Sequence, residues 1–187
     1  MKPTPEQIKK INHFSQVKLE NCKKIADVVE IQSCKPGTHL FKEGDRGDTM
    51  ILVFQGQVEV SKEMMVKTSS GFTTSRKSII RLETTDPKPE SGPEVESSVF
   101  VVQAPAFGIG EFSLVLDNAI RTAHVHSTTP LKYGVLKLED FTKIVKDNPG
   151  IGGNVYFEVA KAAVNNLATV SGDVSNLTQA FFYALSR

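Results

Sequence analysis

The sequence has few cysteines, almost no net charge and no long apolar run, and each shortage argues against a class of protein. Its two cysteines, Cys22 and Cys34, have no CxxC spacing, which argues against a disulfide scaffold and against a zinc site. The net charge is +1, without a basic cluster, so we expect no nucleic acid partner. The apolar runs fall far short of the roughly 20 residues that a membrane helix needs, so we expect no membrane partner.

Targeting and catalytic motifs are also missing. Residues 1–14 are polar and charged and lack the apolar core of a signal peptide, so we expect a cytoplasmic protein. The sequence has no GxSxG, no Walker loop and no HExxH motif. It therefore predicts a protein that is not an enzyme.

The length and composition suit one globular domain. The chain has 187 residues, of which 40% are hydrophobic and 23% charged, as in ordinary folded domains with their own core. We expect a single domain over residues 1–187. Helices are expected at 1–30, a β-barrel at 31–138 and further helices at 139–187.

Short apolar stretches recur about every ten residues in the middle of the chain, separated by glycine, proline and aspartate. This spacing is typical of an all-β barrel or jelly roll and argues against alternating strands and helices. The fold class is therefore mainly β with flanking helices. The expected strands cover residues 28–34, 38–44, 49–56, 57–64, 99–103, 121–127 and 133–138.

Apolar residues at helical spacing predict helices at both ends of the chain. Thr4 is a suitable N-cap for a helix over 4–15, and a second helix is expected over 18–29. After the strands, we expect a short helix over 139–146 and two more over 154–167 and 174–185. Ser171-Gly172-Asp173 predicts a break between the last two helices.

Residues 67–98 interrupt the rhythm of strands with a stretch rich in Ser, Thr, Pro and Glu. Such composition predicts a long, partly mobile hairpin or loop. A tongue that binds a partner protein is the alternative.

The stretch Phe107–Ala123 has an order that suits a sugar phosphate. It begins with glycines, passes Glu111 and a short helix-compatible run, turns at Asp117-Asn118 and reaches Arg121. Backbone N–H groups at the start of a helix can receive a phosphate, and an arginine fork can close on its oxygens. A carboxylate can accept hydrogen bonds from the hydroxyl groups of an attached sugar.

Three motifs in this order resemble the cyclic nucleotide-binding domain family. A turn of the PG…EGD-x-GD type stands at residues 36–48, and a strand followed by G-x-V-x-V stands at 51–60. The phosphate-binding cassette stands at Gly110–Leu114 and Arg121–Ala123. The resemblance covers residues 14–167. It implies an eight-stranded jelly-roll β-barrel, a double-stranded β-helix, with N-terminal helices and C-terminal hinge or lid helices.

The resemblance also implies a ligand, cAMP or cGMP, and the residues that hold it. Arg121 would hold the cyclic phosphate and Glu111 the ribose 2′-OH. Thr122 could hydrogen-bond guanine, but a threonine there also occurs in domains that respond to cAMP, so the choice between adenine and guanine stays open. A cyclic dinucleotide also remains open. No metal and no cofactor are expected. The implied ligand-binding residues are Gly110, Glu111, Phe112, Ser113, Leu114, Arg121, Thr122 and Ala123.

Two departures from the family pattern keep other functions open. The sequence has FGIGE at 107–111 where the family has FGE, and the 67–98 stretch is longer than the family's hairpin. We expect a sensor that relays occupancy through its C-terminal helices to a homodimer mate or a downstream effector protein. One alternative is an interaction module that has lost its ligand. The other is a cupin-like metal enzyme, because His124 and His126 form an HxH pair on one strand.

Overall fold

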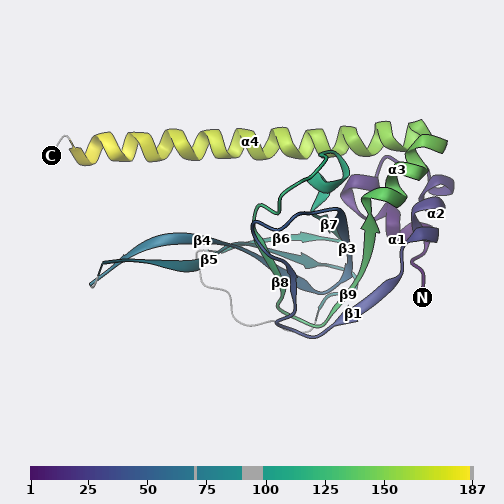
Figure 1. Cartoon of the computed structure of the whole chain (residues 1–187), viewed down its shortest axis with the longest axis horizontal. Helices are drawn as coiled ribbons and strands as arrows, with labels where there is room; N and C mark the ends of the chain where they lie inside the picture. Colours follow the sequence, from purple (N-terminus) through teal and green to yellow (C-terminus); the bar gives the residue numbers. More distant parts are fainter. Residues whose placement is uncertain (70, 90–98, 186–187) are drawn as a thin grey trace.

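The computed structural model describes residues 1–69, 71–89 and 99–185, which form two facing β-sheets, helices at one end and a long C-terminal helix (Figure 1). In the first sheet the strand order is β1-β9-β3-β7, and in the second it is β2-β8-β4-β5-β6. The strands are β1 (Ile31–Cys34), β2 (His39–Phe41), β3 (Thr49–Gln55), β4 (Gln57–Thr68), β5 (Gly71–Thr84), β6 (Phe100–Ala104), β7 (Phe107–Ile109), β8 (His124–Ser127) and β9 (Leu131–Lys137).

The mainly β jelly roll with flanking helices is confirmed, with two differences in detail. The strands form two separate sheets rather than a closed barrel. The described residues also hold nine strands rather than eight, and β6, which matches the strand expected over 99–103, pairs in parallel with β5 at the edge of the second sheet. All the other strand pairs are antiparallel. A parallel partner requires a crossover connection between the two strands.

Strand β3 is apolar along its length because both of its faces are covered. Met50, Leu52 and Phe54 pack into a core shared with the helices. Ile51 and Val53 pack on the opposite face, in the core between the two sheets. Alternate residues of a strand point to opposite faces, so a strand between two cores shows a continuous apolar run.

The N-terminal helices cover the outer face of the first sheet. They are α1 (Pro5–Lys9), the 3₁₀ helix η1 (Asn12–Phe14) and α2 (Leu19–Val28). Thr4 caps α1 as expected, in a reciprocal capping box with Gln7. The single helix expected over 4–15 is wrong beyond Lys9. Ile11 forms a β-bridge with Ala106, and a residue in such a bridge has extended backbone that ends the helix.

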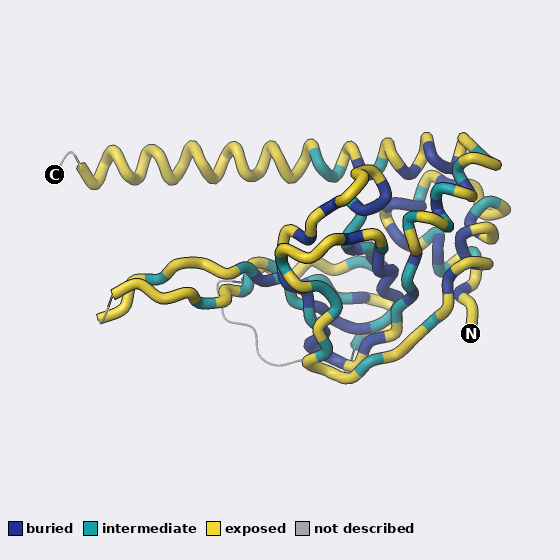
Figure 2. Tube along the Cα trace, viewed as in Figure 1, coloured by how far each residue is buried: buried dark blue, intermediate teal, exposed yellow. Residues whose placement is uncertain are grey.

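The C-terminal helices are α3 (Leu138–Asp147) and α4 (Pro149–Leu185). The break expected at residues 171–173 is wrong, because α4 runs through it without interruption. One helical glycine costs only about 1 kcal/mol relative to alanine, which neighbouring turns can offset. The first turns of α4 are buried against the body of the molecule, and the rest projects beyond it (Figures 1 and 2).

A two-stranded hairpin, β4–β5, projects from the sheets in the same direction as α4 (Figure 1). Its strands include residues 67–68 and 71–84 of the stretch that interrupted the strand rhythm, so a hairpin is present there as predicted. The segment 90–98 lies outside the described residues. Among the described helices, none is both long and apolar enough to cross a membrane.

Candidate ligand-binding site

The FGIGE segment begins as a regular strand, not as a bulge. Phe107, Gly108 and Ile109 form β7 and pair in unbroken register with β3. Both apolar side chains of β7 are buried in the core between the sheets. A Cβ at Gly108 would overlap Cε of Met50 and lie 3.1 Å from Nδ1 of His13. The N-terminal helical segment and Met50 therefore pack closely on β7 at Gly108, and a side chain there would force Met50 to move.

The cassette turns at Gly110 into the short 3₁₀ helix η2 (Glu111–Leu114). Gly110 has φ +82°, in the left-handed region that favours glycine, and a Cβ there would lie 2.5 Å from Nη1 of Arg121. The amide of Ser113 donates to the carbonyl of Gly110 at 3.1 Å, so the 3₁₀ turn itself uses this N–H. The turn expected at Asp117-Asn118 is present, with Asn118 at φ +59°.

Arg121 reaches the centre of the site from the segment just before β8, three residues earlier than the strand begins. Its side chain is 8% exposed. Nη1 donates to Oγ of Ser113 at 2.9 Å, and Nη2 donates to the carbonyl and Oγ1 of Thr49, both at 2.8 Å. Cζ lies 3.6 Å from the centroid of the Phe41 ring, a cation–π contact.

The turn at residues 44–48 encloses the same arginine. The backbone of Arg121 donates to the carbonyl of Asp45 at 2.8 Å and accepts from the amide of Gly44 at 2.9 Å. A Cβ at Gly47 would lie 2.6 Å from Cζ of Arg121. Two motifs that are far apart in the sequence therefore meet at one guanidinium.

The charge of Arg121 has no counter-ion in contact with it among the described residues. Its hydrogen bonds go to hydroxyl and carbonyl oxygens, and no described Asp or Glu pairs with it. Burial lowers the pKa of Arg121, while the nearby Asp48, Asp45 and Glu111 raise it. A buried cation without a carboxylate partner favours an anionic ligand.

A cavity of about 390 Å³ lies beside this arginine. Its floor is the inner face of the second sheet, its wall is the cassette, and Asn166 of α4 reaches it. Of the residues implied by the resemblance, only Leu114 is absent from the lining, since its side chain is buried in the core shared with the helices. The lining residues that the resemblance did not imply are Phe41, Val60, Ile80, Leu82, Gly108, Ile109, Ala119, Ile120, Val125 and Asn166.

His13 is buried behind the cassette. It is 3% exposed in η1, which packs against β7 and α4, and neither ring nitrogen has a hydrogen-bond partner among the described residues. Burial lowers the pKa of His13, and the charges of Glu111 on η2 and Glu158 on α4 raise it. His13 was not predicted from the sequence, because a lone histidine in a polar helical segment has no recognisable pattern.

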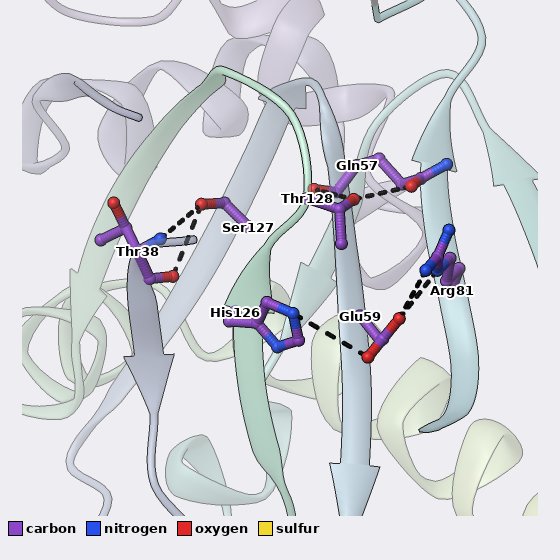
Figure 3. Close-up of polar contacts among 7 residues, drawn as sticks. All are labelled: Thr38, Gln57, Glu59, Arg81, His126, Ser127 and Thr128. Atoms are coloured by element: carbon purple, nitrogen blue, oxygen red, sulfur yellow. Dashed lines mark hydrogen bonds and ion pairs between the residues drawn. The ribbon is translucent and has the colours of Figure 1, made fainter. Parts of the chain in front are cut away.

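The two histidines of the HxH pair lie on the outer face of the second sheet, away from the cavity. Arg81, Glu59 and His126 lie side by side across β5, β4 and β8, and Nε of Arg81 donates to Glu59 at 2.8 Å (Figure 3). His124 lies 3.6 Å from Glu63 through Nε2. In the described part of the chain, no group of three or more His, Cys, Asp or Glu residues could hold a metal ion.

Two facing sheets, N-terminal helices and a glycine cassette that leads to a buried arginine define a jelly-roll domain. Known structures agree. The chain is similar to the catabolite activator protein of Thermus thermophilus, with a TM-score of 0.62 and 17% identity over 89% of this chain and 63% of that one. It is similar to the N-terminal domain of a transcriptional regulator of Streptomyces coelicolor A3(2), with a TM-score of 0.61 and 19% identity over 88% and 94%.

A cyclic nucleotide-binding domain from Methylobacillus flagellatus gives a TM-score of 0.57 and 19% identity over 89% of this chain and 77% of that one. No protein-family model matches the chain. No curated protein matches it either. The structural likenesses establish the fold, which is that of the cyclic nucleotide-binding domains.

Proposed function

We propose that the chain is a non-catalytic sensor that binds a cyclic nucleotide, cAMP or cGMP, in the cavity beside Arg121. The observation that carries this proposal is the buried guanidinium of Arg121, which has no carboxylate partner in the described chain and opens on a cavity lined by the cassette. The guanidinium would hold the cyclic phosphate in a bidentate, charge-assisted contact. Glu111, at the same wall, would accept a hydroxyl of the ribose.

The remaining cassette residues have supporting roles in this proposal. Gly110 keeps the backbone close to the phosphate because a side chain there would collide with Arg121. Phe112 and Ser113 line the cavity beside it, and Thr122 and Ala123 line the side that leads into β8. Thr122 is the residue through which guanine would be preferred over adenine.

Calorimetric titration with cAMP and with cGMP tests the proposal. The wild-type protein should bind at least one of them, and Arg121→Ala should weaken that binding by at least 100-fold, because it removes the charge that meets the phosphate. Arg76→Ala is the matched control, since Arg76 lies on the projecting hairpin with only a 4.0 Å ion pair to Glu63. No heat with either nucleotide from folded wild-type protein would refute the proposal.

A second candidate is an interaction module that keeps the fold without a ligand. It is favoured because the guanidinium of Arg121 already has partners within the chain. It donates hydrogen bonds to Ser113 and Thr49 and lies over the ring of Phe41. This candidate predicts that neither nucleotide raises the melting temperature. It also predicts a complex with a partner protein that is lost when the projecting part of the β4–β5 hairpin is removed.

The relay would pass through α4. Asn166 joins α4 to the cavity, and the rings of Phe141 and Tyr156 meet edge to face at 5.9 Å where α3 and α4 pack together. A ligand that contacts both the cassette and α4 would favour one position of the helix over another. Only a difference in affinity between the two positions can produce such a shift.

The partner in this relay would be a second copy of the chain, paired along α4. Between Lys161 and Arg187, Asp173 is the only charged residue in the sequence, so most of the projecting helix is uncharged. Apolar side chains that are more than half exposed recur there at alternating steps of three and four, the seam of a coiled coil. These are Leu167, Val170, Val174, Leu177 and Phe181.

A further inference from the structure

The outer part of the β4–β5 hairpin has no other strand beside it in the described chain. β8 pairs with β4 only as far as Ser61, and β6 pairs with β5 only from Ile80 onward. Beyond these points the two strands pair only with each other, and most of their residues are exposed. A two-stranded ribbon is marginally stable in water when nothing packs on its faces. A hairpin of this length is therefore expected to contact a partner.

The free end of this hairpin carries exposed apolar side chains. Met65 is 78% exposed and Phe72 is 73% exposed, close to the turn between Thr68 and Gly71. In the register Phe72 stands opposite Lys67, two residues beyond Met65 on β4. Alternate residues of a strand share a face, so Met65 and Phe72 are diagonal neighbours on the same face. Together they form an apolar tip.

The same ribbon is positively charged. Residues 61–78 include four cations and only one acid, Glu63. The cations are Lys62, Lys67, Arg76 and Lys77. Lys62 and Lys77 stand directly opposite each other in the register, and like charges in such a pair destabilise a sheet. No described Asp or Glu forms an ion pair with either lysine. An anionic partner would relieve this repulsion.

The far end of α4 is apolar around its circumference. Phe181, Phe182 and Tyr183 are each more than half exposed. Successive residues of a helix are about 100° apart, so the three rings point in three directions. A partner helix along the seam that includes Leu177 and Phe181 would cover only one of these directions. An apolar layer that surrounds the end of the helix would cover all three.

Both apolar ends lie on the same side of the molecule. The hairpin and α4 project from the body in one direction, and both end far from the N-terminal helices (Figure 1). Both projections are mostly exposed (Figure 2). A broad, flat surface can contact the two ends at once. Two tethered contacts reinforce each other, because the first raises the effective concentration for the second.

We propose that the tip of the hairpin and the end of α4 form a docking surface for an anionic phospholipid bilayer. Phe72 and the aromatic end of α4 enter the boundary between headgroups and acyl chains, while the lysines of the ribbon lie against the anionic headgroups. A bilayer offers a flat surface, negative charge and an apolar layer together. The expectation of no membrane partner concerned helices that cross a bilayer, whereas this contact is with its surface. It does not depend on the nucleotide.

Sedimentation of the full chain with vesicles tests this inference. One set of vesicles contains phosphatidylcholine and phosphatidylserine in equal parts, and the other contains phosphatidylcholine alone. The wild type should bind the anionic vesicles and should bind the neutral ones at least about 10-fold more weakly. High salt should release it from the anionic vesicles, because salt screens the attraction.

Paired lysine variants test the role of the ribbon charge. Lys62→Ser combined with Lys77→Ser should weaken binding to the anionic vesicles about 30-fold, since each cation near such a surface contributes about 5-fold. Lys18→Ser combined with Lys23→Ser makes the same change of charge at α2, at the opposite end of the molecule (Figure 1). This control should bind as the wild type does.

Two phenylalanine variants test insertion of the apolar tip. Phe72→Ser should weaken binding to the anionic vesicles about 10-fold or more, because it removes apolar surface that the bilayer buries. Leu19→Ser, which removes an exposed apolar side chain from α2, should not. The sequence has no tryptophan, so Phe72→Trp provides a single fluorescent reporter. Its emission should shift to shorter wavelength on anionic vesicles, whereas that of Leu19→Trp should not.

Three results would overturn this inference. One is a wild-type protein that does not sediment with the anionic vesicles, and another is equal binding by Phe72→Ser, by the Lys62 and Lys77 variant and by the wild type. The third is binding to polyglutamate as strong as to the vesicles and unchanged in Phe72→Ser, which would indicate an acidic protein partner. Each would leave the proposed function standing, because nucleotide binding is measured without lipid.

Discussion

The guanidinium of Arg121 lies over the ring of Phe41, with Cζ 3.6 Å from the ring centroid. Phe41 therefore does more than fill the floor of the cavity, because it also supports the arginine that lines it. The ring is also 3.0 Å from the position of a Cβ on Gly110. One phenylalanine thus stands in contact with both halves of the cassette.

Replacing Phe41 should weaken ligand binding without unfolding the protein. Phe41→Leu keeps apolar volume but removes a cation–π contact, which is worth up to about 2 kcal/mol where the cation is desolvated. We expect about 3- to 30-fold weaker binding of the nucleotide by calorimetry. Phe72→Leu, on the exposed hairpin, is the control, and an unchanged affinity of Phe41→Leu would show that Arg121 needs no support from the ring.

A methyl group at position 108 should destabilise the fold. Gly108→Ala would force its Cβ against Cε of Met50, a side chain that is fully buried, and overpacking of this kind costs about 1 to 3 kcal/mol. Gly150→Ala meets no atom within 4 Å and should be neutral or slightly stabilising. Urea unfolding of the two variants measures the contrast, and equal midpoints would contradict it.

Stability at mildly acidic pH should depend on His13. Burial lowers the pKa of His13 in the folded protein below its value of about 6.5 in the unfolded chain, so the unfolded chain binds the proton first. The contribution of neutral His13 to the free energy of unfolding is fully present above about pH 6.5. It is lost as the pH falls toward the pKa of His13 in the folded protein. Glu111 and Glu158 are the charges that limit this loss.

His13→Leu should therefore lose less stability than the wild type between pH 7 and pH 5. One site contributes at most about 1.4 kcal/mol per pH unit. The pKa of His126 is also lowered, first by burial, so His126→Asn serves as a comparison for a histidine outside the helical core. Urea unfolding at each pH gives the free energy of unfolding as a function of pH. Parallel curves for wild type and His13→Leu would exclude His13 as the source of the loss of stability at acidic pH.

A charge in the seam of α4 should separate the expected dimer. Leu177→Glu places a carboxylate among apolar side chains that face a partner helix, which should shift a micromolar solution from dimer to monomer in light scattering. Asn176→Glu, one residue earlier and outside the seam, should leave the dimer intact. A monomeric wild-type protein would remove the basis for pairing along α4.

The residues around Arg121 at the cationic end of the cavity were predictable, and those that form its apolar part were not. Arg121, Glu111 and the turn at residues 36–48 have side-chain chemistry and spacing that are visible in the sequence. Ile80 and Asn166 line the cavity only because a strand and a distant helix come to rest there. No local pattern distinguishes them from other strand and helix residues.

Two features were missed for physical reasons. The strand expected over 99–103 is present as β6, but its parallel pairing with β5 is a long-range contact that composition does not reveal. The continuity of α4 through Gly172 was missed because the residues beside it, such as Ser171 and Asp173, are also poor helix formers, whereas an established helix adds each further residue at little cost. In both places a tertiary or cooperative effect overrode the local preference.

The uninterrupted α4 has a mechanical consequence. At 1.5 Å per residue its 37 residues extend for about 55 Å, and only the first turns are anchored in the body. A rotation of about 10° at the anchored end would displace the far end by about 10 Å, by the geometry of a rigid rod of this length. The helix would thus act as a lever with its fulcrum at Pro149, and the displacement would grow along its length.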